Sequence, residues 1–502
     1  MTNDTPRNAA LAMEAATFRQ LGHRLVDQLA DLLASVPRGP VTHGEPPSIV
    51  RAALGLTGPL PESGMDPGPL LEQTAGLLFE HSLFNAHPRF FGYITSSPAP
   101  IGILGDFLAS AVNPNVGSFI LSPAATEIES QTVRWIAELI GYPADCGGLL
   151  VSGGNMANLV CFLAARDAKA DWNVRAHGVG GRAGRTLRVY CSVDTHTWIQ
   201  KAADLSGLGV ESIRWIPTDS GLRMDVMSLE RQLDADRATG DVPGVVIGTG
   251  GSVSTGAVDP LRDIAAVCRE YGAWFHVDGA YGGFAAAVPE GPDDLRGLSE
   301  ADSVAVDPHK WLYAPLEAGC ALVRNPEALR AAFWYHPPYY HFDEQATNYV
   351  DYGPQNSRGF RALKVWLALR HVGAAGYRRM IAEDIRLSQA MAAAVSRHPD
   401  LELMTQDLSI TTFRYVPRDL RTEVREERIE RYVDSVNREL LDRLQRGGEV
   451  FVSNAVIHGR YALRACIVNF HTDLVDVEAL PEIVARVAQQ VDADLRPPAV
   501  SR

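Results

Sequence analysis

The sequence has few cysteines, and no two of them stand at the spacing of a metal site. The six cysteines of the 502 residues occur singly, mostly inside apolar runs, without a C-x-x-C motif: Cys146, Cys161, Cys191, Cys268, Cys320 and Cys466. This distribution is typical of reduced core thiols, and it argues against a disulfide framework or a structural zinc site. We therefore expect an intracellular, cytoplasmic protein.

Long apolar runs and an excess of positive charge are also missing. No uninterrupted apolar stretch reaches the ~18 residues that a membrane span needs, and the polar start "MTNDTPRNAA" lacks the apolar core of a secretory signal. The net charge of −14 leaves no basic surplus for nucleic acid or an anionic membrane. With 46% hydrophobic and 21% charged residues, the composition is that of an ordinary globular protein.

Three regions follow one another along the chain. Residues 11–36 carry apolar side chains at helical spacing, followed by Pro/Gly-rich connectors. We interpret 1–95 as a helical arm that packs on a partner subunit or on its own chain. Residues 124–326 alternate helix-like stretches with short apolar runs, which predicts a mostly parallel α/β sheet within a large domain, 96–372. Strand and helix candidates in 373–502 predict a small α+β domain.

Chemistry-bearing residues follow several of the predicted strands, where ligands of open α/β sheets gather. The run "LLVS" leads into "GGNMANLV", a glycine turn that opens a helix and can bind a phosphate, although it is equally a plain strand-to-helix turn. Asp278 follows "AWFHV" and is flanked by small residues. Lys310, in "DPHKW", follows "SVAV". Because a lysine is rarely buried without a partner, this one is either ion-paired or chemically active.

An amine, a carboxylate and an anion cradle are together what pyridoxal 5′-phosphate (PLP) requires: an imine-forming lysine, an acid beside the ring nitrogen and a phosphate site. Two rival motifs are weaker. "GVGGRA" at 178–183 fits a dinucleotide pattern but does not follow a strand. A metal site built from His276, Asp278 and His309 would leave Lys310 without a role, so we predict none.

Several motifs together resemble the group II PLP-dependent amino-acid decarboxylases: "HPRFFGY", "SPAATEIE", "SGGNMANLVCFLAAR", "HVDGAYGG", "DPHKWL" and "SRGFRALKVW". The resemblance runs in order over nearly the whole chain, and aromatic-L-amino-acid decarboxylases are the most similar. It implies the aspartate-aminotransferase-like fold type I, PLP as cofactor, and a homodimer with its active site at the subunit interface. It also implies a carboxy-lyase whose substrate is a small molecule, an amino acid.

The resemblance also implies residue roles. Lys310 resembles the Schiff-base lysine, Asp278 the partner of the pyridine nitrogen, Ala280 the small residue under the ring, and His196 the imidazole stacked above it. Thr249 resembles a threonine near the ring, and Gly154, Asn155 and His309 fall at phosphate-binding positions. Without the resemblance, His196 would be interpreted as structural and Thr249 as part of a flexible loop. Asp307 stands where many relatives carry asparagine, so a carboxylate would face the phosphate, and we assign it no role.

The family's catalytic loop corresponds to residues 333–357, where Tyr339 matches the loop tyrosine and Tyr340 is a neighbouring alternative. Phe91, Tyr93 and Ser357 match the substrate pocket. A tyrosine in the loop favours decarboxylation over aldehyde synthesis, and serine at 357 favours phenols or imidazole over indole. We therefore expect tyrosine or DOPA as substrate, with tryptophan as a further candidate. The alternatives are an aromatic aldehyde synthase, a decarboxylase of glutamate, aspartate or histidine, and a catalytically silent scaffold.

Overall fold

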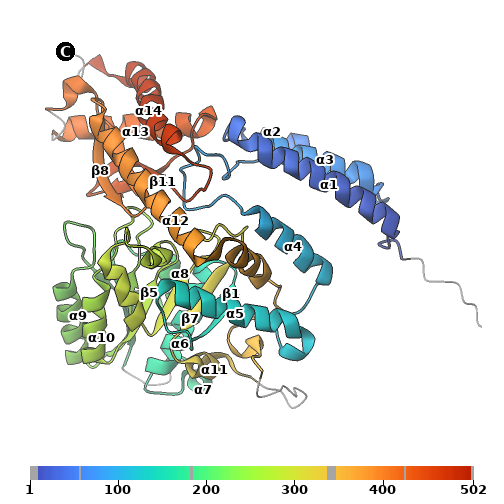
Figure 1. Cartoon of the computed structure of the whole chain (residues 1–502). Helices are drawn as coiled ribbons and strands as arrows, with labels where there is room; N and C mark the ends of the chain where they lie inside the picture. Colours follow the sequence, from blue (N-terminus) through green and yellow to red (C-terminus); the bar gives the residue numbers. More distant parts are fainter. Residues whose placement is uncertain (1–8, 56–57, 181–184, 336–345, 423–425, 499–502) are drawn as a thin grey trace, which may run out of the picture.

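The computed structural model describes residues 9–55, 58–180, 185–335, 346–422 and 426–498 (Figure 1). At its centre lies a seven-stranded sheet in the order β1-β7-β6-β5-β4-β2-β3. The strands are β1 Gly147–Val151, β2 Leu187–Ser192, β3 Ile213–Ile216, β4 Val242–Thr249, β5 Trp274–Asp278, β6 Ser303–Val306 and β7 Gly319–Val323. All residues of β1, β5, β6 and β7 are buried, as in strands covered on both faces.

Helices cover both faces of the sheet and form a separate hydrophobic core on each. One core contains residues of α6 Gly154–Lys169, α8 Trp198–Leu205 and α11 Pro326–Phe333. The other contains residues of α5 Pro123–Ile140, α9 Val226–Ala238, α10 Leu261–Tyr271 and the first part of α12 Ala362–Arg397. A short helix, α7 Val174–His177, follows α6. This layering confirms the predicted α/β class.

One strand runs against the others, and its connection carries the candidate lysine. The neighbours from β6 through β5, β4 and β2 to β3 pair in parallel, whereas β7 pairs antiparallel with both β6 and β1. A parallel strand would need a long crossover, but a reversed strand can follow directly. The segment 307–318 therefore turns back at the carboxyl end of β6 and stays at the ligand-binding edge of the sheet.

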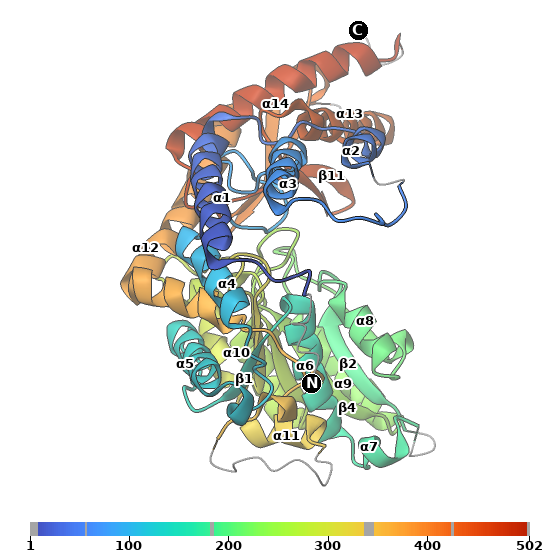
Figure 2. The same ribbon diagram turned by 90° about the vertical axis from the view of Figure 1, so that its right-hand side faces the viewer.

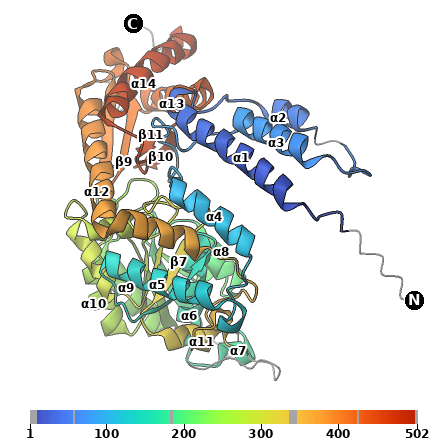
Figure 3. The ribbon, with the colours of Figure 1, turned by 45° about the vertical axis from the view of Figure 1, so that its right-hand side comes forward.

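The C-terminal region forms a second sheet, entirely antiparallel, in the order β10-β11-β9-β8. Its strands are β8 Leu401–Asp407, β9 Ile410–Tyr415, β10 Ser453–Ile457 and β11 Arg460–Cys466, and they pack with α13 Glu427–Gly447 and α14 Leu474–Leu495. Helix α12 contacts β8 and β9 of this sheet as well as α5, which covers one face of the large sheet (Figure 3). It bends at Gly373, whose φ of 69° and ψ of 163° are not helical. Gly373 is the first residue of the predicted C-terminal domain, 373–502. The limits of the three domains remain a prediction.

The N-terminal helices expose apolar side chains. Helices α1 Ala15–Ser35, α2 Pro47–Leu54 and α3 Pro67–His81 lie together beside the rest of the chain, and α4 Pro100–Val112 runs on toward the large sheet (Figures 1 and 2). Exposed apolar side chains on α1 and α4 line a cavity of about 280 Å³ with almost no polar surface, among them Phe18, Val26, Leu104 and Phe107. Such a face is usually covered by another protein surface.

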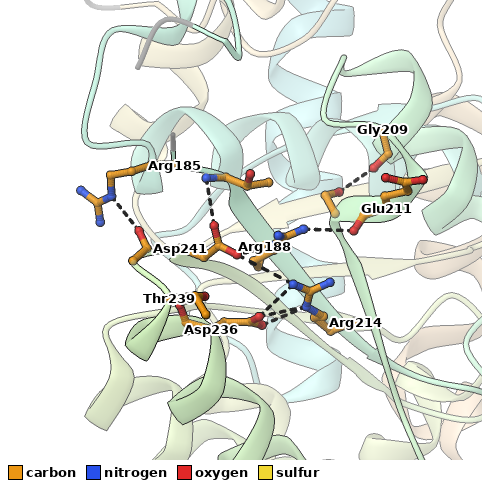
Figure 4. Close-up of polar contacts among 11 residues, drawn as sticks. Arg185, Arg188, Gly209, Glu211, Arg214, Asp236, Thr239 and Asp241 are labelled. Atoms are coloured by element: carbon orange, nitrogen blue, oxygen red, sulfur yellow. Dashed lines mark hydrogen bonds and ion pairs between the residues drawn. The ribbon is translucent and has the colours of Figure 1, made fainter. Parts of the chain in front are cut away.

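Ion pairs link the edge strand β3 and its neighbour β2 to adjacent segments of the chain (Figure 4). The short strand β3 was not predicted from the sequence. Arg214 of β3 forms a two-pronged ion pair with Asp236 of α9, at 2.9 Å between Nη2 and Oδ1. Arg188 of β2 pairs with Asp241 at 2.6 Å. Charge on an edge strand discourages pairing with another chain. In β3 the charged Arg214 interrupts the short apolar run on which strand prediction depends.

Two further findings bear on the class of protein. All six cysteines are free thiols, and all but Cys146 are buried. Among the described residues, no helix is long and apolar enough to cross a membrane.

Candidate active site

The segment that follows β6 fixes Lys310 at the edge of the large sheet. Trp311 and Tyr313 are buried directly after the lysine, and both donate hydrogen bonds to Asp384 of α12, at 2.9 and 2.7 Å. The side chain of Lys310 is only 18% exposed, and its Nζ lies 3.0 Å from Oδ2 of Asp307. The backbone around the lysine is therefore anchored in the core, while its amine reaches a cavity.

Asp278 ends β5 and is held by donors on two sides. Trp198 Nε1 donates to Oδ2 at 2.7 Å, and the backbone N–H of Ala280 donates to Oδ1 at 3.2 Å. Hydrogen bonds to a carboxylate favour its charged form. The ring of Trp198 is itself packed edge-on against buried His276, with 5.7 Å between centroids. Asp278 thus presents a fixed, oriented negative charge.

The N-terminus of α6 lies beside Asp307. Gly153 precedes the helix with φ at 81°, and no side chain caps the first turn. A Cβ on Gly154 would lie 2.7 Å from Oδ2 of Asp307 and 3.0 Å from Cβ of Ala280, so glycine is required for close approach there. A helix start without a side-chain cap offers N–H donors and a partial positive charge, which suit a phosphate.

His196 and Thr249 extend the same edge. His196 lies between β2 and α8, where burial lowers the pKa of its imidazole and the charge of Asp278 opposes that effect. Thr249 pairs in register with Asp278, because β4 and β5 are parallel neighbours. The backbone N–H of Thr249 donates to Asp259 at 2.8 Å, whereas its buried Oγ1 has no hydrogen-bond partner.

One cavity of about 550 Å³ unites most of the predicted site residues. Its lining includes Lys310, Asp278, His196, Gly154, Asn155, Thr249, Ala280, His309 and Tyr93. Burial lowers the pKa of His309, and the nearby charge of Asp307 opposes this shift. The strand ends therefore converge on one concave site, as expected for an open α/β sheet.

Two of the three predicted substrate residues do not line the cavity, and the predicted catalytic tyrosine is not described. Phe91 is fully buried in the core of the C-terminal region, with its backbone bonded to Phe451 and Cys466. This corrects its prediction as a pocket wall, because its ring has no free face. Ser357 is exposed and does not line the cavity. Tyr339 lies outside the described residues.

The structure adds residues that the sequence did not point to. Arg464 of β11 lines the cavity although it is only 3% exposed. Its Nη1 donates to the carbonyl of Tyr93 and to Oγ of Ser453, each at 3.1 Å, while Nε and Nη2 have no partner. Ser453 and Asn454 of β10 also line the cavity. The only sequence signal for Arg464 is an arginine inside an apolar strand, "YALRAC".

The rival metal set does not form a cluster. Nδ1 and Nε2 of His276 are 2.9 and 2.7 Å from Oγ of Ser303 and Oδ1 of Asn158, so both ring nitrogens are used inside the core. Burial lowers the pKa of His276 to about 4, which keeps the ring neutral. In the described part of the chain, no three His, Cys, Asp or Glu side chains are grouped for a metal ion.

The residues around the cavity fit a phosphorylated aldehyde with a basic ring. They supply an amine, a held carboxylate and an uncapped helix start, and buried polar atoms of Thr249, Asp307 and Arg464 point to a missing polar ligand. This combination defines a class, the pyridoxal phosphate-dependent enzymes of fold type I.

Comparison with known proteins specifies the class. Residues 66–416 match the pyridoxal-dependent decarboxylase conserved domain. The aromatic-L-amino-acid decarboxylase of Bacillus atrophaeus is 32% identical over 96% of this chain and 97% of that protein. A phenylacetaldehyde synthase of a Rosa hybrid cultivar is 29% identical over 91% of each. The crystal structure of Oryza sativa TDC with PLP and tryptamine superposes with a TM-score of 0.87 at 29% identity, covering 95% of this chain and 99% of that one.

The chain therefore belongs to the group II pyridoxal phosphate-dependent decarboxylases and is a carboxy-lyase. Its cofactor is pyridoxal 5′-phosphate. The relatives act on different substrates or by different reactions, so family membership identifies decarboxylation of an amino acid and no particular side chain.

Proposed function

We propose that this enzyme decarboxylates an aromatic L-amino acid to the corresponding amine and CO₂, with tyrosine or DOPA favoured and tryptophan as a further candidate. The observation that carries the proposal is the single cavity in which Lys310, Asp278 and Arg464 meet. The similarity to aromatic-L-amino-acid decarboxylase over nearly the whole chain supports the aromatic class.

In this proposal the bound cofactor supplies an aldehyde that bonds covalently to an amine and a ring that accepts electrons. Lys310 provides the amine that holds it. Asp278 keeps the ring nitrogen protonated, because a nearby anion favours the cationic form. The start of α6 at Gly154 and Asn155, together with His309, holds the phosphate, and His196 covers the ring.

Arg464 is the group we propose for the substrate carboxylate. Among the described residues that line the cavity, Lys310 and Arg464 are the only lysine and arginine. A buried guanidinium with two unpartnered nitrogens costs free energy, and hydrogen bonds from these nitrogens to a carboxylate would offset that cost. Because Lys310 binds the cofactor in this proposal, Arg464 is the remaining cation among these residues, and it can pair with one substrate carboxylate. Glutamate and aspartate carry a second carboxylate, so this arrangement favours an aromatic substrate.

Aromatic side chains lie at the mouth of the cavity. Tyr93 lines it, is 57% exposed and has a φ of 52°, and its ring centroid lies 6.1 Å from that of Phe451. Phe451 stacks in turn on Phe90 at 5.4 Å. We propose that Tyr93 contacts the substrate ring, since paired aromatic faces stabilise an aromatic ligand.

We also propose a homodimer in which the exposed apolar face of α1, α3 and α4 packs on a second copy. The resemblance implies this arrangement, and the nearly nonpolar cavity on this face supports it. In the dimer, Ser357 and the proton-donating Tyr339 would act near the interface. Light scattering of the purified protein at micromolar concentration tests the assembly, and a monomer would contradict it.

A substrate panel tests the function. Purified, cofactor-loaded enzyme is incubated with each of the twenty amino acids and with DOPA, while CO₂, amine, aldehyde, ammonia and peroxide are measured. We expect CO₂ and amine in equal amounts from tyrosine or DOPA. Formation of aldehyde, ammonia and peroxide would instead establish an aldehyde synthase. This activity is the second candidate, because the similar protein from rose is a phenylacetaldehyde synthase. Turnover confined to glutamate, aspartate or histidine would contradict the aromatic assignment.

A further inference from the structure

Asp307 is a buried carboxylate with an incomplete set of partners. It follows β6 directly, and its side chain is 2% exposed. Oδ2 pairs with Nζ of Lys310 at 3.0 Å and lies 3.7 Å from Nε2 of His309. Oδ1 is buried and has no hydrogen-bond partner. A buried oxygen without a partner is costly, so a polar group is expected to reach it.

The carboxylate also lies against the start of α6. Its two oxygens are 2.7 and 3.2 Å from the position of a Cβ on Gly154, the first residue of that helix. An anion is stabilised at a helix N-terminus. Asp307 therefore lies at the helix end that suits a phosphate, and it binds the amine that the cofactor must also reach.

We propose that Asp307 is a positioning residue that holds the amine of Lys310 through their ion pair in the cofactor-free chain and competes with the cofactor phosphate for the start of α6. Cofactor binding then has to displace or neutralise this carboxylate. Two anions cannot share one helix start at low cost in a site shielded from water. The charges of Lys310 and Asp307 balance each other until the cofactor binds, and the affinity for the cofactor is lower than an asparagine at position 307 would give.

The inference rests on the proposed phosphate site at α6, and two simple probes separate its parts. Inorganic phosphate carries the anion without an aldehyde, whereas pyridoxal carries the aldehyde without a phosphate. The variant Asp307→Asn removes the charge and keeps the shape. The matched control is Asp106→Asn, which removes a carboxylate paired with Lys364 at 3.1 Å outside the cavity.

Binding is measured on full-length, cofactor-free protein: phosphate by calorimetry, and pyridoxal by absorbance and borohydride trapping on Lys310. In Asp307→Asn we expect phosphate to bind about tenfold tighter or more. We expect pyridoxal, which carries no phosphate, still to attach to Lys310 in this variant. Asp106→Asn should match the wild type in both measurements.

Unchanged or weaker phosphate binding in Asp307→Asn would overturn the inference, as would an equal change in Asp106→Asn. If pyridoxal and PLP fail to attach to Lys310 in the wild type, the proposed site itself is wrong, which is a distinct outcome. Asp307→Ser, which also removes the charge, is the second variant if the asparagine protein does not fold, and its expected phosphate affinity changes in the same direction.

Discussion

Two buried ion pairs, Arg358–Glu129 and Lys310–Asp307, have opposite surroundings. Arg358 and Glu129 are 1% and 0% exposed. Arg358 also donates to the carbonyls of Val116 and Leu150, at 2.9 and 2.7 Å, while Glu129 accepts from the backbone N–H of Leu150. Lys310 instead has one acidic partner at bonding distance and reaches a cavity.

The difference lies in what each pair borders. The bonds of Arg358 tie the chain after residue 357 to β1, and neither Arg358 nor Glu129 lines the cavity. Both pairs keep buried atoms without a partner, Arg358 Nε and Glu129 Oε2 in one and Asp307 Oδ1 in the other. Only the Lys310 pair lies beside a space large enough for a cofactor, so we interpret it as the functional pair and the enclosed Arg358 pair as structural.

The largest expected effect comes from breaking the functional pair. Lys310→Ala should lower kcat/KM by about 10³-fold or more, since no other described lysine lines the cavity to bond the cofactor. Borohydride reduction followed by peptide mass spectrometry should find a cofactor adduct on Lys310 in the wild type and none in the variant. Its unfolding free energy should fall by only ~1–2 kcal/mol, because water can reach Asp307 through the cavity. Full activity in Lys310→Ala would contradict the assignment.

Breaking the structural pair should affect stability more. Arg358→Ala leaves the Glu129 carboxylate buried without its cation, which costs about 3–5 kcal/mol. Urea unfolding monitored by circular dichroism measures the change. The control is Arg134→Ala, which breaks a half-exposed pair with Glu138 and should cost less than ~1 kcal/mol. Equal losses in the two variants would remove the distinction between enclosed and open pairs.

A third buried carboxyl, Asp384, has no cation at hydrogen-bond distance among the described residues. It extends the comparison to a group whose contribution to stability depends on pH. Burial raises its pKa to about 7, against the opposing hydrogen bonds from Tyr313 and Trp311. The folded chain therefore binds a proton that the unfolded chain has lost between about pH 4 and 7, so this group's contribution to stability decreases as pH rises through that window.

Asp384→Asn should remove this dependence. Relative to the wild type, the variant should be more stable at pH 8 than at pH 5 by at most ~3 kcal/mol, because about two pKa units of the shift lie between pH 5 and 7. Urea unfolding of both proteins at the two pH values gives the difference, in which the titration of other groups such as His276 cancels. A stability difference that does not vary with pH would show that Asp384 is ionised throughout.

Much of the fold could be predicted because its local signals agree. The buried strands β1, β4, β5 and β6 are short apolar runs between helical stretches, and that alternation predicted the parallel α/β sheet. The strands β3 and β10 were missed, because in each of them exposed side chains interrupt the apolar pattern. The reversal of β7 was also missed, since strand direction is set by pairing rather than by composition.

For the site, the sequence predicted the residues at the ends of the large sheet's strands and missed the residues that the second sheet contributes. Asp278 ends a strand that could be located, and Lys310 and Gly154 each follow one. Arg464 comes from the second sheet, and its role depends on how that sheet packs on the first. Phe91 was misplaced because a motif match gives a position in the chain and not the side on which a ring is buried.

By itself the sequence determined the fold class and the cofactor, and it predicted Lys310 as the lysine that binds this cofactor, because each depends on short segments whose residues act locally. Only the tertiary structure decided which carboxylates have partners. Whether Asp278 is held by Trp198, Asp307 by Lys310 or Glu129 by Arg358 depends on contacts between segments far apart in the chain. Burial then fixes the electrostatic cost of leaving any of those charges alone.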